Sequence, residues 1–444
     1  MIDPFSSQRA MRQMRRDAIQ RGVIAVLDIG TYKVSALVLK VEPAQSTPKA
    51  QGIGNLGIQA GFRVIGAGNT RSRGVVLGEV AAMNETESAI RTALQAAQKM
   101  AQTRVDHVIV CLSGGNLRSY GLDGKVDLHG QTVTENDIAR VMAACDVPDF
   151  GMGRNVLHAQ PINFALDHRS GLSDPRGQIG QALACDMHLV TVDSTLVQNI
   201  CNCLKRCDIE LAGIVASSYA SGMSALVEDE QELGAACIDL GAGVTGVSIF
   251  MKKHMIFTEA VRIGGAHVTS DIAKGLRVDL ATAERIKTVH GGVHATSMDD
   301  REFIEINADS GDWEKDRRRV SRSELIGIMR PRIEEILEEA RARLDGAGFS
   351  AMPSQQVVLT GGGAQVPGID GLAARIFGQQ VRLGRPVRVR GLPQAASGPA
   401  FASAVGLCLL ATAPQDEWWD FETPRDTYPA RSLKRAVRWF RDHW

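Results

Sequence analysis

Short apolar runs rich in β-branched residues alternate with longer stretches of helical periodicity along most of the chain. VIAVLDIG at 23–30 and HVIVCLSG at 107–114 predict strands, whereas ESAIRTALQAAQKMA at 87–101 has its apolar residues at helical spacing. Strands and helices in alternation are typical of α/β layers. The pattern therefore predicts an α/β protein whose helices cover its sheets.

One hydrophobic pattern occurs twice, as AVLDIGTYKVSALVL at 25–39 and as ACIDLGAGVTGVSIF at 236–250. Each copy predicts a β-hairpin in which an apolar run brings in an Asp, turns on a Gly and returns as a second apolar run. The glycines let the backbone approach an anion closely, and successive N–H groups in such a turn can bind phosphate oxygens. Asp28 and Asp239 would face one volume and suit a hydrated Mg²⁺. One copy alone would equally fit a plain β-turn, so the repetition carries the prediction.

Two further regions complete the organisation of the chain. QVVLTGGGAQVPGIDGLAARIF at 356–377 predicts a strand, a turn on three consecutive glycines and a helix, after a long predicted helix at 324–344. The segment 105–182 is less regular, with a helix that Thr134 can cap and a loop rich in Gly, Asp and Pro. It has no catalytic signature, and we predict that it is an inserted subdomain.

The composition restricts the possible partners. Among 444 residues, 50 Lys and Arg balance 50 Asp and Glu, so no global field attracts nucleic acid. The eight cysteines are dispersed, and CNCLKRC at 201–207 has no second Cys/His pair at zinc spacing, which favours free buried thiols in a reducing cytoplasm.

The basic residues 1–21 lack the apolar core of a signal peptide, and no run reaches the roughly 18 apolar residues of a spanning helix. We expect a cytosolic body with a flexible N-terminus.

The last residues, RSLKRAVRWFRDHW at 431–444, have the pattern of an amphipathic helix. Before them, TAPQDEWWDFETPRDTYPA at 412–430 is rich in Pro and acidic residues and predicts a flexible linker. Five basic residues and one Asp in 431–444 match an anionic lipid surface, and packing of the helix against the protein is the alternative. The residues predicted to contact the membrane are Leu433, Lys434, Val437, Arg438, Trp439, Phe440, Arg441 and Trp444.

Two short motifs are judged to be decoys. GIGNLG at 52–57 has the letters of a dinucleotide fingerprint, but the residues after it predict no helix that could receive a pyrophosphate. HGGVH at 290–294 has two glycines and no carboxylate partner, so it predicts a loop and not a metal site.

The repeated turns resemble those of the superfamily that contains actin, DnaK-type chaperones and sugar kinases. DIGT at 28–31 is similar to its first phosphate loop, DLGAG at 239–243 to its second, and LTGGGA at 359–364 to its adenosine loop. The resemblance implies an actin-like ATPase fold with two duplicated domains around a nucleotide cleft, and ATP and Mg²⁺ as ligands. AERIKTVHG at 283–291 is similar to the helix that touches adenine and ribose in the chaperones. The implied nucleotide contacts are Asp28, Gly30, Thr31, Tyr32, Lys33, Asp239, Gly241, Ala242, Gly243, Thr245, Glu284, Lys287, Gly361, Gly362 and Gly363, with Asp28 and Asp239 at the metal. Lys33 could equally be a solvated hairpin lysine.

Within this superfamily, the chain most resembles the FtsA family of bacterial cell-division proteins. The likeness rests on LDIGTYKV, VASSYASGMSALVEDEQELG, IGGAHVTSDIAKGL and VVLTGGGAQVPGIDGLAARIF. It implies a protein that tethers FtsZ filaments to the inner face of the cytoplasmic membrane at the division site. Other implied partners are further copies of the chain, in an actin-like polymer, and later division proteins. The family receives the C-terminal peptide of FtsZ on its lid, where Arg319 and Arg322 are candidate contacts, although such a charge run is often only a solvated face.

The resemblance also sets the expected domain boundaries. The two actin-like domains are expected at 22–104 with 183–228, and at 229–265 with 323–411. The remaining segments are 105–182 (inserted subdomain), 266–322 (lid), 412–430 (linker) and 431–444 (membrane helix).

One departure from the superfamily concerns hydrolysis. The actin and chaperone branches have a Glu or Gln that positions the attacking water, but the corresponding VASSYASGM offers Ser217, Ser218 and Tyr219. A hydroxyl is a poor base, so hydrolysis should be slow or absent. A small-molecule kinase and a pilus-assembly actin homologue remain the alternatives, and the amphipathic C-terminus argues against both.

Overall fold

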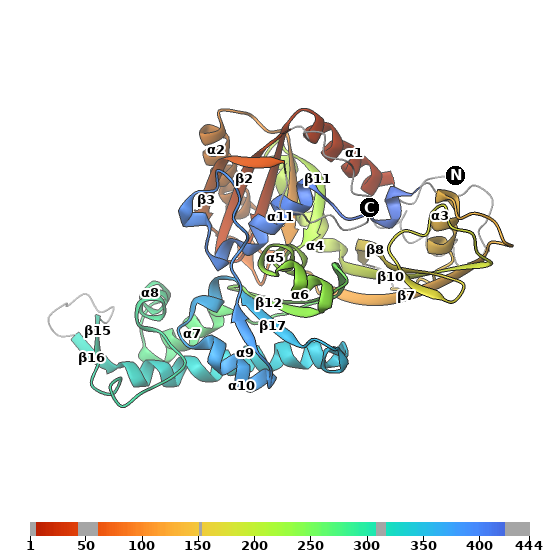
Figure 1. Ribbon diagram of the computed structural model, residues 1–444. Coiled ribbons are helices and arrows are strands. Elements are labelled where there is room, and N and C mark those ends of the chain that lie inside the picture. The colour runs from red at the N-terminus through yellow and green to blue at the C-terminus, as the bar shows by residue number, and fades with distance from the viewer. Residues whose placement is uncertain (1–5, 43–60, 151–152, 308–316, 422–444) are drawn as a thin grey trace.

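The protein consists of two α/β domains, each with an added subdomain (Figure 1). The computed structural model describes residues 6–42, 61–150, 153–307 and 317–421. The sheet of the first domain has the order β11-β6-β1-β2-β3, in which β1, β2 and β3 are antiparallel and β6 and β11 run parallel to β1. Its strands are β1 (Val23–Ile29), β2 (Lys33–Val41), β3 (Phe62–Arg71), β6 (His107–Leu112) and β11 (Glu210–Ala216).

The second domain repeats this topology. Its order β14-β13-β12-β17-β18 again joins three antiparallel strands to two parallel ones. Its strands are β12 (Ala235–Leu240), β13 (Thr245–Met251), β14 (His254–Val261), β17 (Gln356–Thr360) and β18 (Val381–Leu383). The central strands β1 and β12 are buried because they have neighbours on both sides and helices on both faces. The two duplicated domains that the family resemblance implies are therefore present.

Two helices built from small residues lie between the sheets. Gly406 of α11 (Ala402–Thr412) comes so close to α5 (Ser217–Ala225) that a Cβ on it would overlap the carbonyl group of Ala220. Only glycine permits this approach. Although 323–411 was predicted to belong to the second domain, α11 packs into the core of the first, where Leu407 and Cys408 are buried. The other helices are α2 (Met83–Ala101), α4 (Ser194–Arg206), α6 (Glu228–Leu233), α9 (Arg322–Gly346) and α10 (Ile369–Phe377).

The inserted subdomain is a four-stranded antiparallel sheet covered by one helix. Its order is β7-β10-β8-β9, and Thr134 caps the helix as predicted, in a reciprocal capping box with Asp137. Its elements are β7 (Arg118–Asp127), α3 (Glu135–Ala143), β8 (Arg154–Leu166), β9 (Arg169–Leu172) and β10 (Ala182–Asp193). The predicted bounds of 105–182 are wrong at both ends. β6 pairs in the first domain, and β10, which falls almost wholly in the segment 183–228 predicted for that domain, pairs with β7 and β8.

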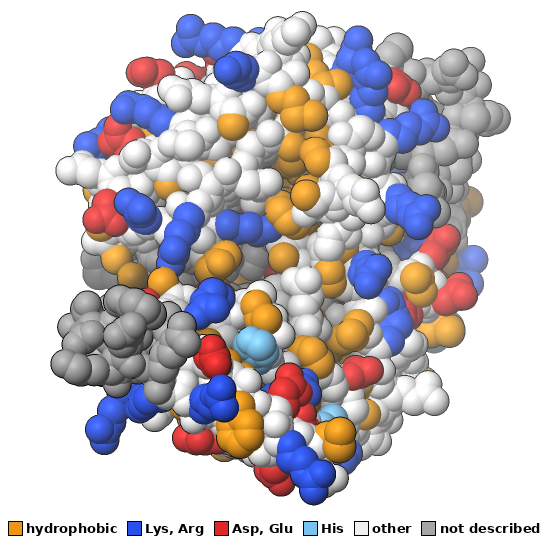
Figure 2. Space-filling view, turned by 90° about the vertical axis from the view of Figure 1, so that its left-hand side faces the viewer, with side chains coloured by type: hydrophobic (Ala, Val, Ile, Leu, Met, Phe, Trp, Pro, Cys, Tyr) orange, Lys and Arg blue, Asp and Glu red, His pale blue; other side chains and the backbone are white. Residues whose placement is uncertain are grey.

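The lid lies on the second domain and shares its core. Ile304, Ile306 and Val320 are buried together with residues of the second sheet, so the lid is not an independent unit. Its elements are α7 (Gly265–Leu276), α8 (Leu280–His290), β15 (Phe303–Asn307) and β16 (Arg317–Ser321). Seen from the side of α8 and β3, basic side chains are spread over both the first domain and the lid (Figure 2).

The basic N-terminal segment is ordered, which corrects the expectation of a flexible N-terminus for residues 6–20. They form α1 (Ser6–Gln20), which lies beside β11 and buries Ala18 in the core of the first domain. Its arginines hold a segment close to the C-terminus. Arg9 donates hydrogen bonds to the carbonyl groups of Trp419 and Phe421, at 3.2 and 2.9 Å, and Arg12 forms an ion pair with Asp420.

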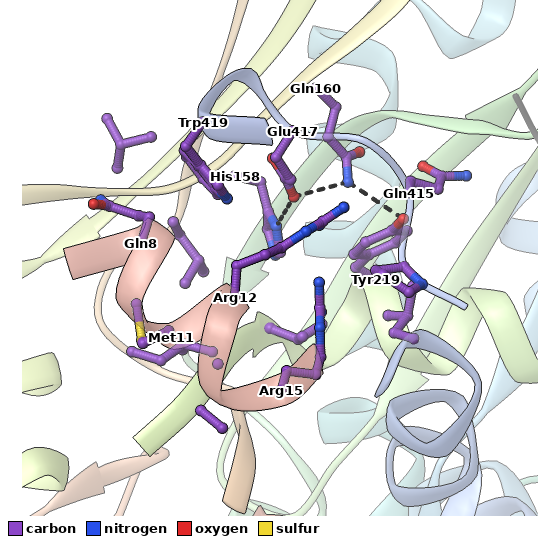
Figure 3. A pocket seen from close by; sticks show the side chains of 18 residues that line it. Gln8, Met11, Arg12, Arg15, His158, Gln160, Tyr219, Gln415, Glu417 and Trp419 are labelled. Atoms are coloured by element: carbon purple, nitrogen blue, oxygen red, sulfur yellow. Dashed lines mark hydrogen bonds and ion pairs between the residues drawn. The ribbon is translucent and has the colours of Figure 1, made fainter. Parts of the chain in front are cut away.

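That second segment corrects the predicted flexible linker 412–430, at least as far as residue 421. Trp418, Trp419 and Phe421 are buried in the core of the inserted subdomain. The carboxylate of Glu417 accepts hydrogen bonds from His158 Nδ1 at 2.9 Å and from the Ala159 amide at 2.6 Å. Linker composition predicts disorder only when no surface receives the aromatic side chains, and here the inserted subdomain receives them. Figure 3 shows this contact at a pocket between α1, β8 and residues 414–419. The pocket has a volume of about 70 Å³.

The predicted membrane helix at 431–444 and the rest of the predicted linker lie outside the described residues. In the part of the chain that the structure describes, no helix combines the length and apolarity needed to cross a bilayer.

Candidate functional site

Both repeated hairpins turn tightly at their glycine. The Gly30 amide donates a hydrogen bond to the Lys33 carbonyl at 3.0 Å, and a Cβ on Gly30 would lie 3.1 Å from that oxygen. The Gly241 amide donates instead to the Asp239 carbonyl at 3.0 Å, and a Cβ on Gly241 would lie 2.5 Å from the Val244 carbonyl. A side chain would be crowded at Gly30 and would clash with the backbone at Gly241, so the glycine of each copy suits its turn.

The two hairpin turns and the triple-glycine turn converge. A Cβ on Gly243 would lie 2.5 Å from Thr31 Oγ1, so the first and second turns face each other at contact distance. Gly361 has a φ of 86°, and a Cβ there would lie 2.7 Å from the Leu240 carbonyl. Its amide donates to the Pro399 carbonyl at 3.2 Å. Three turns predicted from separate parts of the sequence thus converge where the two domains meet.

Two carboxylates lie beside these turns, at the ends of β1 and β12. Asp28 accepts a hydrogen bond from Ser403 Oγ at 2.8 Å, and Asp239 accepts one from Ser221 Oγ. Burial raises the pKa of Asp28, and burial together with the charge of Asp28 raises the pKa of Asp239 to about 6. Two desolvated carboxylates that repel each other are favourably placed to receive a cation.

Lys33 lies near enough to both carboxylates to interact with their charges, and its ammonium lacks a hydrogen-bond partner. Its ammonium is buried, with Asp28 and Asp239 near enough to raise its pKa, yet desolvation dominates and lowers that pKa to about 8. The ammonium lies over the ring of Phe401, 2.9 Å from the ring centroid. A buried ammonium without an acceptor is costly unless a ligand supplies one. Lys33 therefore belongs to the site and is not a solvated hairpin lysine.

These carboxylates predict a pH dependence of stability. The pKa of Asp239 is raised above its unfolded value of 3.8, so the folded state binds more protons and the stabilisation is lost as pH rises through about 6. Asp239 by itself should contribute about 1–2 kcal/mol more to the free energy of unfolding of the unliganded protein at pH 5 than at pH 7.5. Asp420, whose pKa is also raised to about 6, acts in the same direction, whereas burial lowers the pKa of His188 to about 3 and that of His254 to about 4, so the two histidines act in the opposite direction. Urea unfolding of the parent and of Asp239→Asn at several pH values isolates the contribution of Asp239 as the difference between the two proteins. The same pH dependence in both proteins would contradict the prediction.

Three other predicted contacts have internal partners. Thr245 is buried and donates a hydrogen bond to the Ile263 carbonyl at 2.8 Å. Lys287 Nζ forms hydrogen bonds with the Gly265 carbonyl at 3.1 Å and with Glu284 at 2.6 Å. Since the Gly265 amide donates to the Gly241 carbonyl, this pair lies beside the second turn. Thr245 supports the turn from behind, whereas Glu284 and Lys287 join α8 to α7 at its edge.

The hydroxyl groups at the position of the usual catalytic Glu or Gln are engaged elsewhere. Ser218 Oγ is hydrogen-bonded to Thr258 Oγ1 at 2.5 Å, and Tyr219 accepts from Gln160 Nε2 at 3.3 Å. Both side chains are buried, and burial raises the pKa of Tyr219 far above its usual value. Neither is arranged to accept a proton from a water in the site.

Sequence reasoning missed the two serines that donate to the carboxylates and the aromatic ring beneath the Lys33 ammonium. Ser403, Ser221 and Phe401 lie in GPAFASAVG at 398–406 and SSYASGMSA at 217–225. The available signal was the small-residue composition of both stretches, which predicts close backbone approach. The described residues contain no cluster of three or more Cys, His, Asp or Glu side chains for a metal ion, so a cation here would rely on two carboxylates at most.

The two arginines predicted to contact a partner differ in their surroundings. Arg319 is exposed, with Glu305 at 3.4 Å. Arg322 instead braces the lid, because it donates to Asp299 at 2.5 Å and to the His290 carbonyl at 3.1 Å.

Comparison with known proteins gives the family. The model of the cell division protein FtsA matches residues 236–406, and that of the SHS2 domain inserted in FtsA matches residues 114–191. Cell division protein FtsA of Agrobacterium fabrum is 40% identical over 408 residues, covering 92% of this chain and 88% of the relative. Those of Pseudomonas aeruginosa and Escherichia coli are 32% and 30% identical, covering 95% and 88% of this chain and 98% and 90% of theirs. The chain belongs to the FtsA family of cell division proteins.

Solved structures confirm the fold. A PilM–PilN type IV pilus biogenesis complex has a chain with a TM-score of 0.59 at 16% identity, covering 88% of this chain and 99% of its own. MreB5 of Spiroplasma citri bound to ADP has a TM-score of 0.51 at 15% identity, covering 87% of this chain and 95% of its own. The actin-like fold predicted from the sequence is thus confirmed for this FtsA-family chain, and so is the family. The SHS2 match also agrees with the corrected bounds of the inserted subdomain.

Proposed function

We propose that this chain is an ATP-binding division protein that links FtsZ filaments to the inner face of the cytoplasmic membrane. The observation that carries the nucleotide part is the cluster of Asp28, Lys33 and Asp239 among three glycine turns. Lys33 has a buried ammonium without an acceptor, and the turns leave no space for side chains where phosphate oxygens would approach. MreB5 of Spiroplasma citri, with the same fold, has been solved with ADP and with AMPPNP, which supports the proposal.

Mg²⁺ suits the same cluster. It keeps several waters and is held by one or two carboxylates plus phosphate oxygens, which fits the two carboxylates of this site. Asp28 and Asp239 would hold it, and the cation would offset their mutual repulsion. When bound, Mg-ATP would supply a cation for the two carboxylates and phosphate oxygens for the Lys33 ammonium. The chain would orient these groups and exclude water.

We infer that ATP serves as a structural ligand and assembly switch more than as fuel. The hydroxyl groups of Ser218 and Tyr219 are buried and paired, so this helix offers no general base. The lack of a general base on this helix also argues against a small-molecule kinase, which needs a base to take the proton of its substrate hydroxyl. The family places the chain among division proteins, and self-association in an actin-like polymer is part of the proposal.

The membrane and FtsZ parts rest on sequence features. Residues 431–444 would bind the anionic membrane surface, and the lid would receive the C-terminal peptide of FtsZ. Arg319, exposed on β16, could contact that peptide directly. Arg322 would act through the shape of the lid, because it is bound to Asp299.

Sedimentation with anionic liposomes tests the tether. FtsZ should pellet with the liposomes only when the full chain is present, because one protein has to bind both partners. The chain lacking residues 431–444 should leave FtsZ in the supernatant, and so should the full chain with FtsZ that lacks its C-terminal peptide. Equal pelleting of FtsZ with the full and the shortened chain would refute the tethering function.

A further inference from the structure

The hairpin of β4 (Val75–Val76) and β5 (Glu79–Val80) has a strained tip. Leu77 and Gly78 join the two strands, with φ values of 52° and 74°. Two positive φ angles suit a two-residue hairpin turn, but a leucine in this conformation is an uncommon and costly choice. Such strain persists only where the surroundings hold it, so the contacts of the tip are informative.

The tip touches both phosphate turns. The Gly78 amide donates a hydrogen bond to Thr31 Oγ1 at 3.0 Å, which fixes it to the first turn. A Cβ on Gly243 would lie 3.1 Å from the backbone N and Cα of Leu77, so the second turn packs directly against the same tip. The hairpin belongs to the first domain and Gly243 to the second. The tip is therefore a backbone bridge across the site.

The tip also touches the start of the inserted subdomain. A Cβ on Gly114 would lie 2.7 Å from the Leu77 carbonyl, and a Cβ on Gly78 would lie 2.7 Å from the Gly114 amide. Gly114 lies between β6, the last strand of the first sheet before the insertion, and β7, the first strand of the inserted sheet. Two backbones too close to admit a Cβ between them are in direct contact, and such close packing transmits displacement.

An ion pair completes the bridge from the other side. Glu79 Oε1 lies 2.5 Å from Arg262 Nη1, which joins β5 of the first domain to the end of β14 in the second. Arg262 is followed by Gly264 and Gly265, and the Gly265 amide donates to the Gly241 carbonyl at 2.9 Å. The pair therefore connects the hairpin to the second phosphate turn by a second route.

We propose that the hairpin Val75–Val80 is a positioning element that couples the separation of the two phosphate turns to the inserted subdomain. The proposal rests on the proposed nucleotide binding. A phosphate chain held by both turns fixes the distance between Thr31 and Gly243. The tip contacts both turns, so its position follows the distance between them. Because Gly114 packs against the tip, Gly114 moves with it. Glu79 and Arg262 keep the tip seated on the second domain.

Hydrogen–deuterium exchange of the full chain, with and without Mg-AMPPNP, tests the coupling. In the parent, the nucleotide should slow exchange both in the phosphate turns and in β7 (118–127). Glu79→Arg and Arg262→Glu should each lose most of the slowing in β7. The double reversal Glu79→Arg with Arg262→Glu should restore it, because the pair is rebuilt with opposite sense. Affinity for a fluorescent ATP analogue should change by less than about fivefold in each variant, since the pair is half-exposed.

Asp345→Arg is the matched control, because Asp345 forms a similarly exposed pair with Arg341 on α9. It should leave the exchange of β7 unchanged. Slowing in β7 that persists in both single variants would overturn the coupling, as would a parent that binds the analogue without any change in β7. A double reversal that fails to restore the slowing would also overturn it. If the parent does not bind the analogue at all, the proposed nucleotide function fails instead.

Discussion

Gly362→Trp is expected to abolish ATP binding without unfolding the protein. A Cβ on Gly362 would have only the Ala400 Cβ near it, at 3.8 Å, and its φ is not in the left-handed region. A large side chain can therefore be accepted by the fold and would extend from the triple-glycine turn. If this turn receives adenosine, as we propose, affinity should fall at least a hundredfold, or about 2.7 kcal/mol.

The neighbouring glycines would not give a clean result. Gly361 has a φ of 86°, and a Cβ on Gly363 would lie 3.0 Å from the Leu240 carbonyl, so substitutions at either position strain the fold itself. Gly346→Trp is the suitable control, since Gly346 is an exposed glycine at the end of α9 with open space around it. Equilibrium binding of a fluorescent ATP analogue, with circular dichroism to check folding, measures the effect. Parent-like binding by Gly362→Trp would mean that the adenosine turn lies elsewhere.

The second large effect is expected in the tail. Phe440→Glu should release the protein from liposomes at any salt concentration, because burial of one large apolar side chain contributes about 1.5–3 kcal/mol and a carboxylate adds repulsion from the anionic surface. Arg438→Ala together with Arg441→Ala should weaken binding mainly on anionic lipid, by about 1 kcal/mol per residue. A single helix of this kind binds reversibly, so stable attachment should need many tails in one polymer.

Co-sedimentation across a salt series separates the two contributions. Thr427→Glu, which adds the same charge within 412–430, is the control and should pellet like the parent. Phe440→Glu that pelleted as well as the parent would refute membrane insertion of this helix. The tail would then have to dock elsewhere.

The sequence predicted the parts of the fold that depend on local pattern. The two hairpins with Asp28 and Asp239 could be read because period-two apolar runs and a required glycine are short-range signals. The triple-glycine turn was readable for the same reason. The place of α11 in the core of the first domain could not be read from the sequence. Its apolar, small-residue surface fits either core, and only the three-dimensional packing against Ala220 decides between them.

For the candidate site, the sequence likewise predicted the glycine turns but not the side chains that contact its charged groups. Lys33 could not be assigned from sequence, since a hairpin lysine looks the same whether solvated or buried. Ser403 is 375 residues from Asp28 along the chain, and no local pattern relates them. Charge patterns misled in the opposite direction. The arginines of α1 and the acidic residues near 417 each predicted a solvated segment, whereas Arg12 pairs with Asp420 and the neighbouring aromatic side chains are buried.

The contact between α1 and residues 417–421 has a consequence for how the protein is made. The hydrogen bonds from Arg9 to Trp419 and Phe421 join residues 410 and 412 positions apart. During synthesis, α1 leaves the ribosome long before the residues that hold it. Until those residues are made, its apolar face can rest on β11 but its arginines lack their acidic partners. Because contacts between distant residues form late and slowly, this contact should form late in folding, and a chain shortened before residue 417 should leave α1 exposed to proteases.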